Sequence, residues 1–195
     1  KLDINSRNKD DQMITLSKMI TKIDQIIKKL NPKLGIIYGD TNSTLASSIA
    51  LKRNKIEIIH IESGLRSKNI DMPEEQNRII ADRLSKYLIS PNYESRRNLI
   101  KEGIKNENIY VFGDINYDVL NLMRNNIKKY EKNKLFSLNL KSKKYSLITI
   151  HREENSKIEI LLNLINDLNS TNLNYIWPLH PKFKYIKKEL QEKSK

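Results

Sequence analysis

Hydrophobic positions alternate between helical and strand-like spacing along the chain. Apolar residues recur every three or four positions over 10–30, and Asn31-Pro32 stops the helix that this spacing predicts. The segment 34–38, LGIIY, is a short and continuous apolar run, which is typical of a buried parallel strand. Similar runs then alternate with further helical segments. The pattern therefore predicts an α/β protein with parallel sheets and helices on both faces of each sheet.

The alternation predicts two sheets. The predicted strands are 34–38, 56–61, 87–90 and 109–113 in the first sheet, and 145–150 and 174–179 in the second. The predicted helices are 10–30, 42–54, 73–86, 92–103, a long helix from about Tyr117, 156–169 and 182–194. We divide the chain into 1–120, most of an N-terminal Rossmann-like domain without its first strand; 121–144, a linker helix and connection; and 145–195, the start of a second Rossmann-like domain. Doubly wound sheets usually hold about five or more strands, so we expect an internal fragment of a longer protein.

Composition narrows the class of protein. The 195 residues include no cysteine, which excludes a disulfide scaffold, a thiolate metal site and a cysteine nucleophile. No apolar run approaches the ~20 residues of a membrane span, and the first residues show no signal-peptide pattern. We therefore expect a cytoplasmic protein that does not bind membranes.

The net charge of +13 raises the question of nucleic-acid binding. The excess is concentrated, however, in the connection 124–144 and the final segment 182–195. Basic and aromatic residues do not alternate there in the manner of RNA-binding modules. We interpret the excess as lysines on solvated faces and expect no nucleic-acid partner.

Polar residues follow most of the predicted strands. Asp40 follows the first strand, Glu62 the second and His151 the fifth. In open parallel sheets, ligands bind outside the carboxyl ends of the strands, so this placement predicts a site. Each cluster alone also has a structural explanation: Glu74 and Arg78 have the spacing of a helical surface ion pair, and His60 is typical of a hydrogen-bonded core histidine.

The inventory of motifs is selective. There is no GxGxxG, no P-loop GxxxxGK[ST] and no GxSxG, and no pair of histidines has the spacing of metal ligands. Several carboxylates, His151, arginines and helix N-termini remain. Carboxylates can move protons, and arginines and helix N-termini can hold phosphates. These residues favour a phosphate-bearing substrate that is processed by proton transfer.

Six segments together resemble one known family. They are GDTNSTLASSIAL, HIESGLRS, PEEQNR, SPNYESRRNLIKEGI, VFGDINYDVL and TIHREEN. Their order and spacing resemble those of the non-hydrolysing UDP-N-acetylglucosamine 2-epimerases, over essentially the whole chain.

The resemblance implies a GT-B fold, with two Rossmann-like domains and the site in the cleft between them. It implies interconversion of UDP-GlcNAc and UDP-ManNAc by elimination and re-addition of UDP, without metal or nicotinamide. It further implies a homodimer that feeds surface polysaccharide synthesis.

Residue roles carry over by motif position. Asp40, Glu62, Glu74 and His151 are the expected catalytic residues. Arg78, Arg152 and His180 are expected to bind substrate, with His151 and Arg152 nearest the diphosphate.

The chain departs from the family at several points. The GTRPE and SGGxQEE segments of the family are absent, and Asp114 stands where Asn is common, so Asp114 receives no role. We expect this chain alone to have little or no turnover. Three alternatives remain: a hydrolysing epimerase that releases UDP and ManNAc, against which the intact PEEQNR weighs; a GT-B glycosyltransferase; and a nucleic-acid-binding module.

Overall fold

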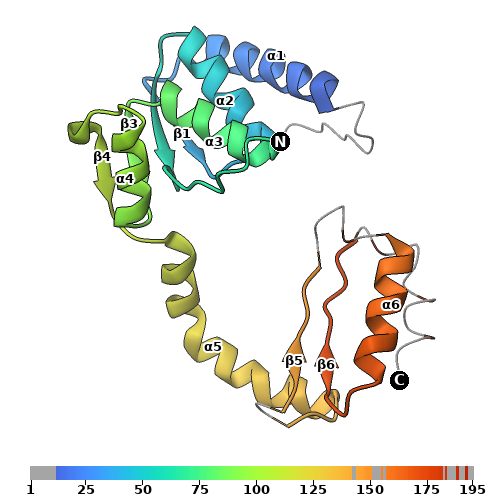
Figure 1. Ribbon diagram of the computed structural model, residues 1–195. Coiled ribbons are helices and arrows are strands. Elements are labelled where there is room, and N and C mark those ends of the chain that lie inside the picture. Colours follow the sequence, from blue (N-terminus) through green and yellow to red (C-terminus); the bar gives the residue numbers. More distant parts are fainter. Residues whose placement is uncertain are drawn as a thin grey trace. The chain divides into compact units, whose positions relative to one another are not determined.

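The computed structural model describes residues 12–141, 144–150, 155, 157–181, 183, 188 and 192. These residues form two compact units, the first ending at Leu122 and the second beginning at Met123. The elements of the first unit are α1 (Gln12–Leu30), β1 (Leu34–Tyr38), α2 (Asn42–Arg53), β2 (Glu57–Ile61), α3 (Pro73–Leu84), β3 (Tyr87–Ser90), α4 (Tyr93–Lys101), the short 3-10 helix η2 (Asn106–Asn108) and β4 (Ile109–Val111). The chain continues with α5 (Ile115–Ser137), which crosses the boundary, and then with β5 (Ser146–Leu147), α6 (Ile158–Asn169) and β6 (Tyr175–Ile176) (Figure 1).

Both sheets are parallel. The first has the strand order β1-β2-β3-β4, and the second pairs β5 with β6. The predicted α/β class, and the assignment of four strands to one sheet and two to the other, are therefore confirmed. β5 and β6 are shorter than the predicted 145–150 and 174–179, because only two residues of each strand pair with the other. The predicted helix 182–194 lies almost entirely outside the described residues.

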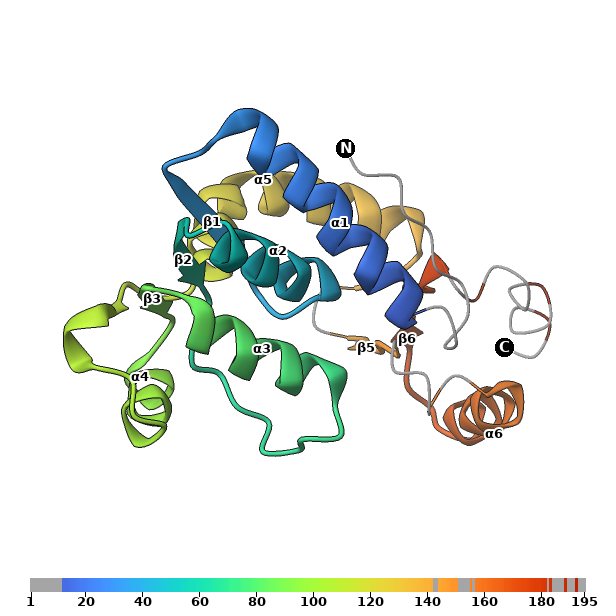
Figure 2. The same ribbon diagram turned by 90° about the horizontal axis from the view of Figure 1, so that it is seen from above.

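The helices of the first unit cover one face of its sheet. α1 packs beside α2 and α2 beside α3, as Figures 1 and 2 show. The row Ile37, His60, Leu88 and Ile109 runs across all four strands on this face and is buried. Each strand is added on the same side of the preceding strand, and right-handed crossovers then place every connecting helix on the same face.

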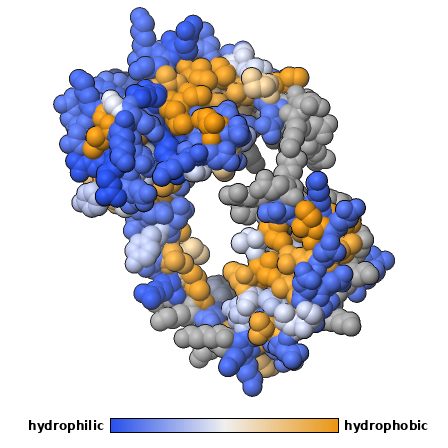
Figure 3. Space-filling model, in the orientation of Figure 1, coloured by the Kyte–Doolittle hydropathy of each residue, from blue (hydrophilic) through white to orange (hydrophobic). Residues whose placement is uncertain are grey.

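The opposite face of this sheet is more exposed. Ile36 is 64% exposed, and Leu34 and Tyr38 in the same strand are exposed as well. The expectation of helices on both faces is therefore wrong for α1 to α4, because the strand order never reverses among the described strands. Figure 3 shows apolar side chains on the surface of both units.

Two apolar clusters stabilise the first unit. The larger joins α1, α2 and α3 to the first two strands: Ile27, Ile37, Ala50, Leu51, Ile58 and Ala81. The smaller joins α4 to the last two strands: Leu88, Leu99 and Ile109. Burying one such side chain contributes about 1.5–3 kcal/mol. The clusters hold the strand ends, where the polar residues gather, in fixed positions relative to the helices.

Candidate active site

Two neighbouring strands and the start of one helix bring most of the predicted residues of the first unit together. Asp40 follows β1, and Glu62 directly follows β2, its partner along the whole length of the strand. α3 supplies Glu75 and Arg78 from its first two turns. Because parallel strands end at the same edge of a sheet, three separate segments place carboxylates and an arginine at that edge.

Arg78 joins the start of α3 to the loop after β1. Its Nη2 donates to Asp40 Oδ2 at 2.5 Å, and its Nη1 donates to Glu75 Oε2 at 3.0 Å. Asn77 strengthens the same junction, because its Nδ2 donates to the Asp40 carbonyl at 2.8 Å and to Asn42 Oδ1 at 3.1 Å. Asp40 and Arg78, two of the predicted site residues, are therefore in direct contact.

Glu75 is a buried carboxylate with a full set of donors. The backbone N–H groups of Ser67 and Lys68 donate to its two oxygens at 2.9 and 3.0 Å, in addition to the bond from Arg78. Burial acts to raise the pKa of Glu75, but these hydrogen bonds outweigh burial and leave the pKa below its ordinary value. Glu75 thereby fastens the loop after β2 to the first turn of α3.

Glu62 occupies an unusual backbone conformation. Its φ is +70°, a left-handed value that is uncommon for a residue with a side chain. Its side chain lies near Gly39 and Tyr38 at the end of β1. Burial, followed by the charge of Glu62, raises the pKa of Tyr38.

Glu74 stands apart from this contact set. It is exposed in the first turn of α3, and within the described part of the chain its side chain has no hydrogen bond or ion pair. The suggested Glu74–Arg78 surface pair is wrong, since Arg78 pairs with Glu75 and Asp40 instead. The side chain of Glu74 therefore makes no hydrogen bond or ion pair with the described residues, and its catalytic role stays a prediction.

The other predicted residues belong to the second unit. His151 and Arg152 lie outside the described residues, and their roles stay predictions. His180 lies shortly after β6, and its side chain is exposed.

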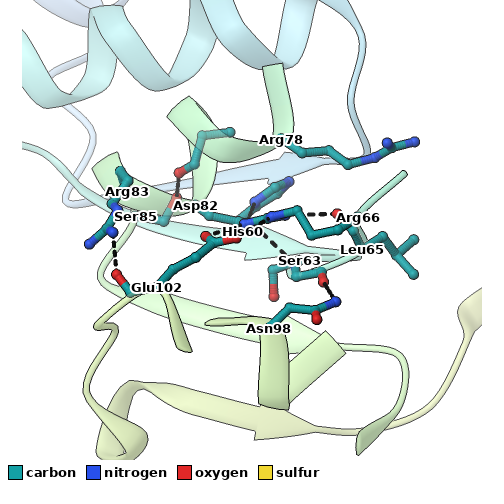
Figure 4. A network of polar contacts seen from close by, with 12 residues as sticks. His60, Ser63, Leu65, Arg66, Arg78, Asp82, Arg83, Ser85, Asn98 and Glu102 are labelled. Carbon is teal, nitrogen blue, oxygen red and sulfur yellow. Dashed lines mark hydrogen bonds and ion pairs between the residues drawn. The ribbon is translucent and has the colours of Figure 1, made fainter. Parts of the chain in front are cut away.

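A buried polar network behind the strand ends was missed by the sequence analysis (Figure 4). Asp82, in the last turn of α3, contacts His60 Nδ1 at 2.7 Å and Arg66 Nη2 at 2.8 Å. Arg66 also binds Glu102 through Nε and Nη2, at 2.7 Å each. Burial acts to lower the pKa of Arg66, but Glu102 and Asp82 outweigh it and raise that pKa, so the guanidinium stays charged. The interpretation of His60 as a hydrogen-bonded core histidine is confirmed, because both of its ring nitrogens have partners.

The sequence held one signal for this network. Glu75, Arg78 and Asp82 stand at positions i, i+3 and i+7 of α3, which is the spacing of the buried face of a helix. Charged residues at such positions point to internal partners, because an unpaired buried charge costs several kcal/mol. The spacing does not reveal which residues those partners are.

The arrangement can support proton transfer next to an anion. Asp40 and Glu62 approach one edge of the sheet from two strands, and Arg78 brings a positive charge to the same place. Among the described residues, no group of three His, Cys, Asp or Glu side chains is placed to hold a metal ion, and no helix is long and apolar enough to cross a membrane.

Comparison with known proteins identifies relatives of the whole chain. The model of the UDP-N-acetylglucosamine 2-epimerase family matches residues 1–194. A UDP-N-acetylglucosamine 2-epimerase homolog of Methanococcus maripaludis is 43% identical over 172 residues, which are 87% of this chain and 48% of the relative. A UDP-2,3-diacetamido-2,3-dideoxy-D-glucuronate 2-epimerase of Pseudomonas aeruginosa is 34% identical over 172 residues, 85% of this chain and 47% of the relative.

A solved structure agrees in fold as well. It is the UDP-GlcNAc 2-epimerase of Methanocaldococcus jannaschii in complex with UDP-GlcNAc and UDP, with a TM-score of 0.82 and 31% identity over 97% of this chain and 53% of that chain. The chain thus spans about half the length of the relatives it matches. The fold class is α/β of the GT-B type, as the resemblance implied. With a family match over nearly its full length and this agreement in fold, the chain belongs to the UDP-N-acetylglucosamine 2-epimerase family.

Proposed function

We propose that the whole protein interconverts UDP-GlcNAc and UDP-ManNAc without net hydrolysis. The observation that carries the proposal is the contact of Arg78 with Asp40 and Glu75, with Glu62 at the end of the neighbouring strand, in a chain related to an epimerase solved with UDP-GlcNAc and UDP. A carboxylate removes the proton from C2 of the sugar, and the bond between C1 and the UDP oxygen breaks. UDP and a 2-acetamidoglucal result. UDP then returns to C1, and a proton is delivered to the opposite face of C2.

The roles follow the residue types. Asp40, Glu62 and Glu74 are the proposed acid and base groups. Inversion at C2 requires proton-transfer groups on both faces of the sugar, and these three carboxylates are the candidates for them. Arg78 orients the Asp40 carboxylate and adds positive charge beside the substrate. We assign the diphosphate to His151 and Arg152, since charge develops there as UDP leaves. His180 is the proposed further substrate contact.

Several wider properties are also proposals. They are a homodimeric assembly, action in the cytoplasm, supply of surface polysaccharide synthesis, and turnover without metal or nicotinamide. The family resemblance supports them. The relative that acts on a UDP-2,3-diacetamido glucuronate supports a second substrate, a diacetamido uronate on the same UDP carrier.

Proton NMR of the whole protein with UDP-GlcNAc in D₂O tests the proposal. The expected result is UDP-ManNAc with deuterium at C2, since the proton that returns comes from solvent-exchanged groups. Asp40→Asn and Glu62→Gln are expected to lower the rate about 10²- to 10⁴-fold. Asp24→Asn, a change of carboxylate to amide at an ion pair of α1 with Lys28, is the control and is expected to retain the rate.

Other outcomes identify the alternatives. Free UDP with ManNAc would indicate a hydrolysing epimerase and contradict the proposal. An unchanged spectrum with UDP-GlcNAc, followed by C2 exchange with a UDP-diacetamido uronate, would move the assignment to that substrate.

A further inference from the structure

Asp82 is a fully buried carboxylate that the proposed chemistry does not use. It lies in the last turn of α3 with 0% exposure, and all of its partners lie in loops or strands of the first unit. Its Oδ1 contacts His60 and its Oδ2 contacts Arg66, and Figure 4 shows Asp82 close to both residues. Each oxygen belongs to a chain of hydrogen bonds that ends at one of the loops carrying a proposed acid or base.

The first chain reaches the loop of Asp40. Asp82 Oδ1 contacts His60 Nδ1 at 2.7 Å, and His60 Nε2 contacts the Gly39 carbonyl at 2.9 Å. A carbonyl oxygen only accepts, so Nε2 carries a proton. Nδ1 faces the Asp82 carboxylate, which also accepts a hydrogen bond from the Arg66 guanidinium. Gly39 directly precedes Asp40 in the chain.

The second chain reaches the loop of Glu62. Gly64 N–H donates to Asp82 Oδ2 at 3.1 Å, and the Gly64 carbonyl accepts from Asn98 Nδ2 at 3.0 Å. The peptide groups of Gly64 are thus held from α3 on one side and from α4 on the other. Gly64 stands two residues after Glu62, whose backbone is itself in the left-handed region.

Arg66 and Glu102 keep this carboxylate in place. Arg66 lies between Asp82 and Glu102 and bonds to both, so the buried carboxylate has a fixed counter-charge. Buried ion pairs of this kind often contribute little to stability compared with apolar side chains of similar size. Their geometry, in contrast, is demanding, because each hydrogen bond holds a specific pair of atoms.

We propose that Asp82 is a positioning residue that fixes the separation of Asp40 and Glu62 by holding the loops after β1 and β2 to one carboxylate. The proposal rests on the proposed function, in which these two side chains handle protons at the sugar. It does not place Asp82 in contact with substrate. A misplacement of about 1 Å in an active site can lower a rate about 10²-fold, so a carboxylate behind the site can matter for turnover.

The test is Asp82→Asn in the whole protein, assayed by C2 exchange with UDP-GlcNAc in D₂O. The amide has nearly the same size but offers only one acceptor oxygen. We expect kcat to fall about 10- to 100-fold, while KM changes far less, because the groups that hold the nucleotide are elsewhere. Asp24→Asn is the matched control on α1, and it is expected to leave kcat and KM unchanged.

The ¹⁵N NMR signals of His60 supply a readout independent of turnover. In the wild type the Nδ1 and Nε2 signals are expected to be those of hydrogen-bonded nitrogens that face Asp82 and Gly39. In Asp82→Asn the Nδ1 signal is expected to move, while the Nε2 signal changes far less. An Nδ1 signal that is the same in wild type and variant would contradict the first hydrogen-bond chain.

A second variant covers the case in which Asp82→Asn does not fold. His60→Gln removes the Nδ1 contact with Asp82, so Gly39 is no longer linked to that carboxylate, and leaves the Gly64 and Arg66 bonds of Asp82 in place. It is expected to lower kcat in the same direction. In the double variant the two reductions in kcat are expected not to multiply, because both changes break the hydrogen-bond chain from Asp82 through His60 to Gly39.

The results separate this inference from the proposed function. An active wild type whose Asp82→Asn and His60→Gln variants keep the full kcat would overturn only the positioning role, and so would losses that multiply independently. A wild type without C2 exchange on any UDP-sugar would overturn the proposed function, and the positioning role with it.

Discussion

Glu74 and Glu75 are adjacent and chemically identical, yet their environments differ. Glu75 is 2% exposed and accepts hydrogen bonds from two backbone N–H groups and from Arg78. Glu74 is exposed. Successive residues of a helix point about 100° apart, so only one of the two can face the interior. At the residue scale, an exposed carboxylate and a buried structural carboxylate therefore lie next to each other in the PEEQNR segment.

Glu75→Gln is expected to lower the free energy of unfolding by about 1–3 kcal/mol at pH 7, because two N–H groups and Arg78 lose the charge that they bind. The folded-state pKa of Glu75 lies below its ordinary value of 4.5. The stabilisation is thus complete above pH 4.5 and is lost as the pH falls through the folded-state pKa. Urea unfolding of wild type and variant from pH 7 down to pH 3 measures this difference.

Glu74→Gln is the matched control for that experiment. Its free energy of unfolding is expected to stay within about 0.5 kcal/mol of wild type, since the side chain has few contacts to lose. A stability difference for Glu75→Gln that does not change with pH would contradict the role of the ionised carboxylate.

At the scale of elements, the loop from β2 to α3 depends on close packing against α4. Gly64 has a φ of +81°, and a Cβ at this position would lie 2.5 Å from the Ser95 carbonyl oxygen. Gly103, after the end of α4, has nearly the same φ, +82°, but open space around it. The two glycines therefore separate the cost of backbone conformation from the cost of crowding.

Gly103→Ala is expected to destabilise the protein by about 1–2 kcal/mol, the cost of a left-handed residue with a side chain. Gly64→Ala is expected to cost a further ~1–3 kcal/mol, because a backbone oxygen must move to admit the methyl group. It is also expected to slow C2 exchange, since the displaced loop carries Glu62. Thermal or urea unfolding of both variants checks the comparison, and equal losses would show that crowding at Gly64 is unimportant.

At the scale of the whole molecule, the first sheet has one covered face and one with apolar side chains exposed. The row Tyr38, Ile61, Ile89 and Tyr110 crosses the four strands on the uncovered face. The chain also spans about half the length of its relatives. The chain therefore corresponds to about half of the fold of those relatives.

The chain of residues 1–195 alone is expected to show little or no turnover in the D₂O assay, whereas the whole protein is expected to be active. The reason is that the chain matches only about half the length of each of these relatives. The same NMR assay on both proteins at equal concentration measures the difference. Robust epimerisation by residues 1–195 would refute this expectation.

Periodicity and turn residues alone predicted the α/β class, the six strands, and the position of Asp40 and Glu62 at strand ends. These features are local: apolar spacing reports which side of an element is buried, and strand ends follow from the strands. Because neighbouring parallel strands end at the same edge of a sheet, the loops that follow them lie close together. The resemblance supplied the family, which the comparisons confirm.

Only the tertiary structure decided which charges meet. Arg78 had a plausible partner four residues away in Glu74, but it binds Asp40 and Glu75. Asp82 received no role from the sequence, but it joins His60, Gly64 and Arg66. These contacts link segments that are distant in sequence, and their geometry depends on how α3 packs over the sheet. The charge and spacing of residues along the sequence do not show which partners a buried side chain will meet. Its burial and orientation depend on all the residues that surround it in the folded protein.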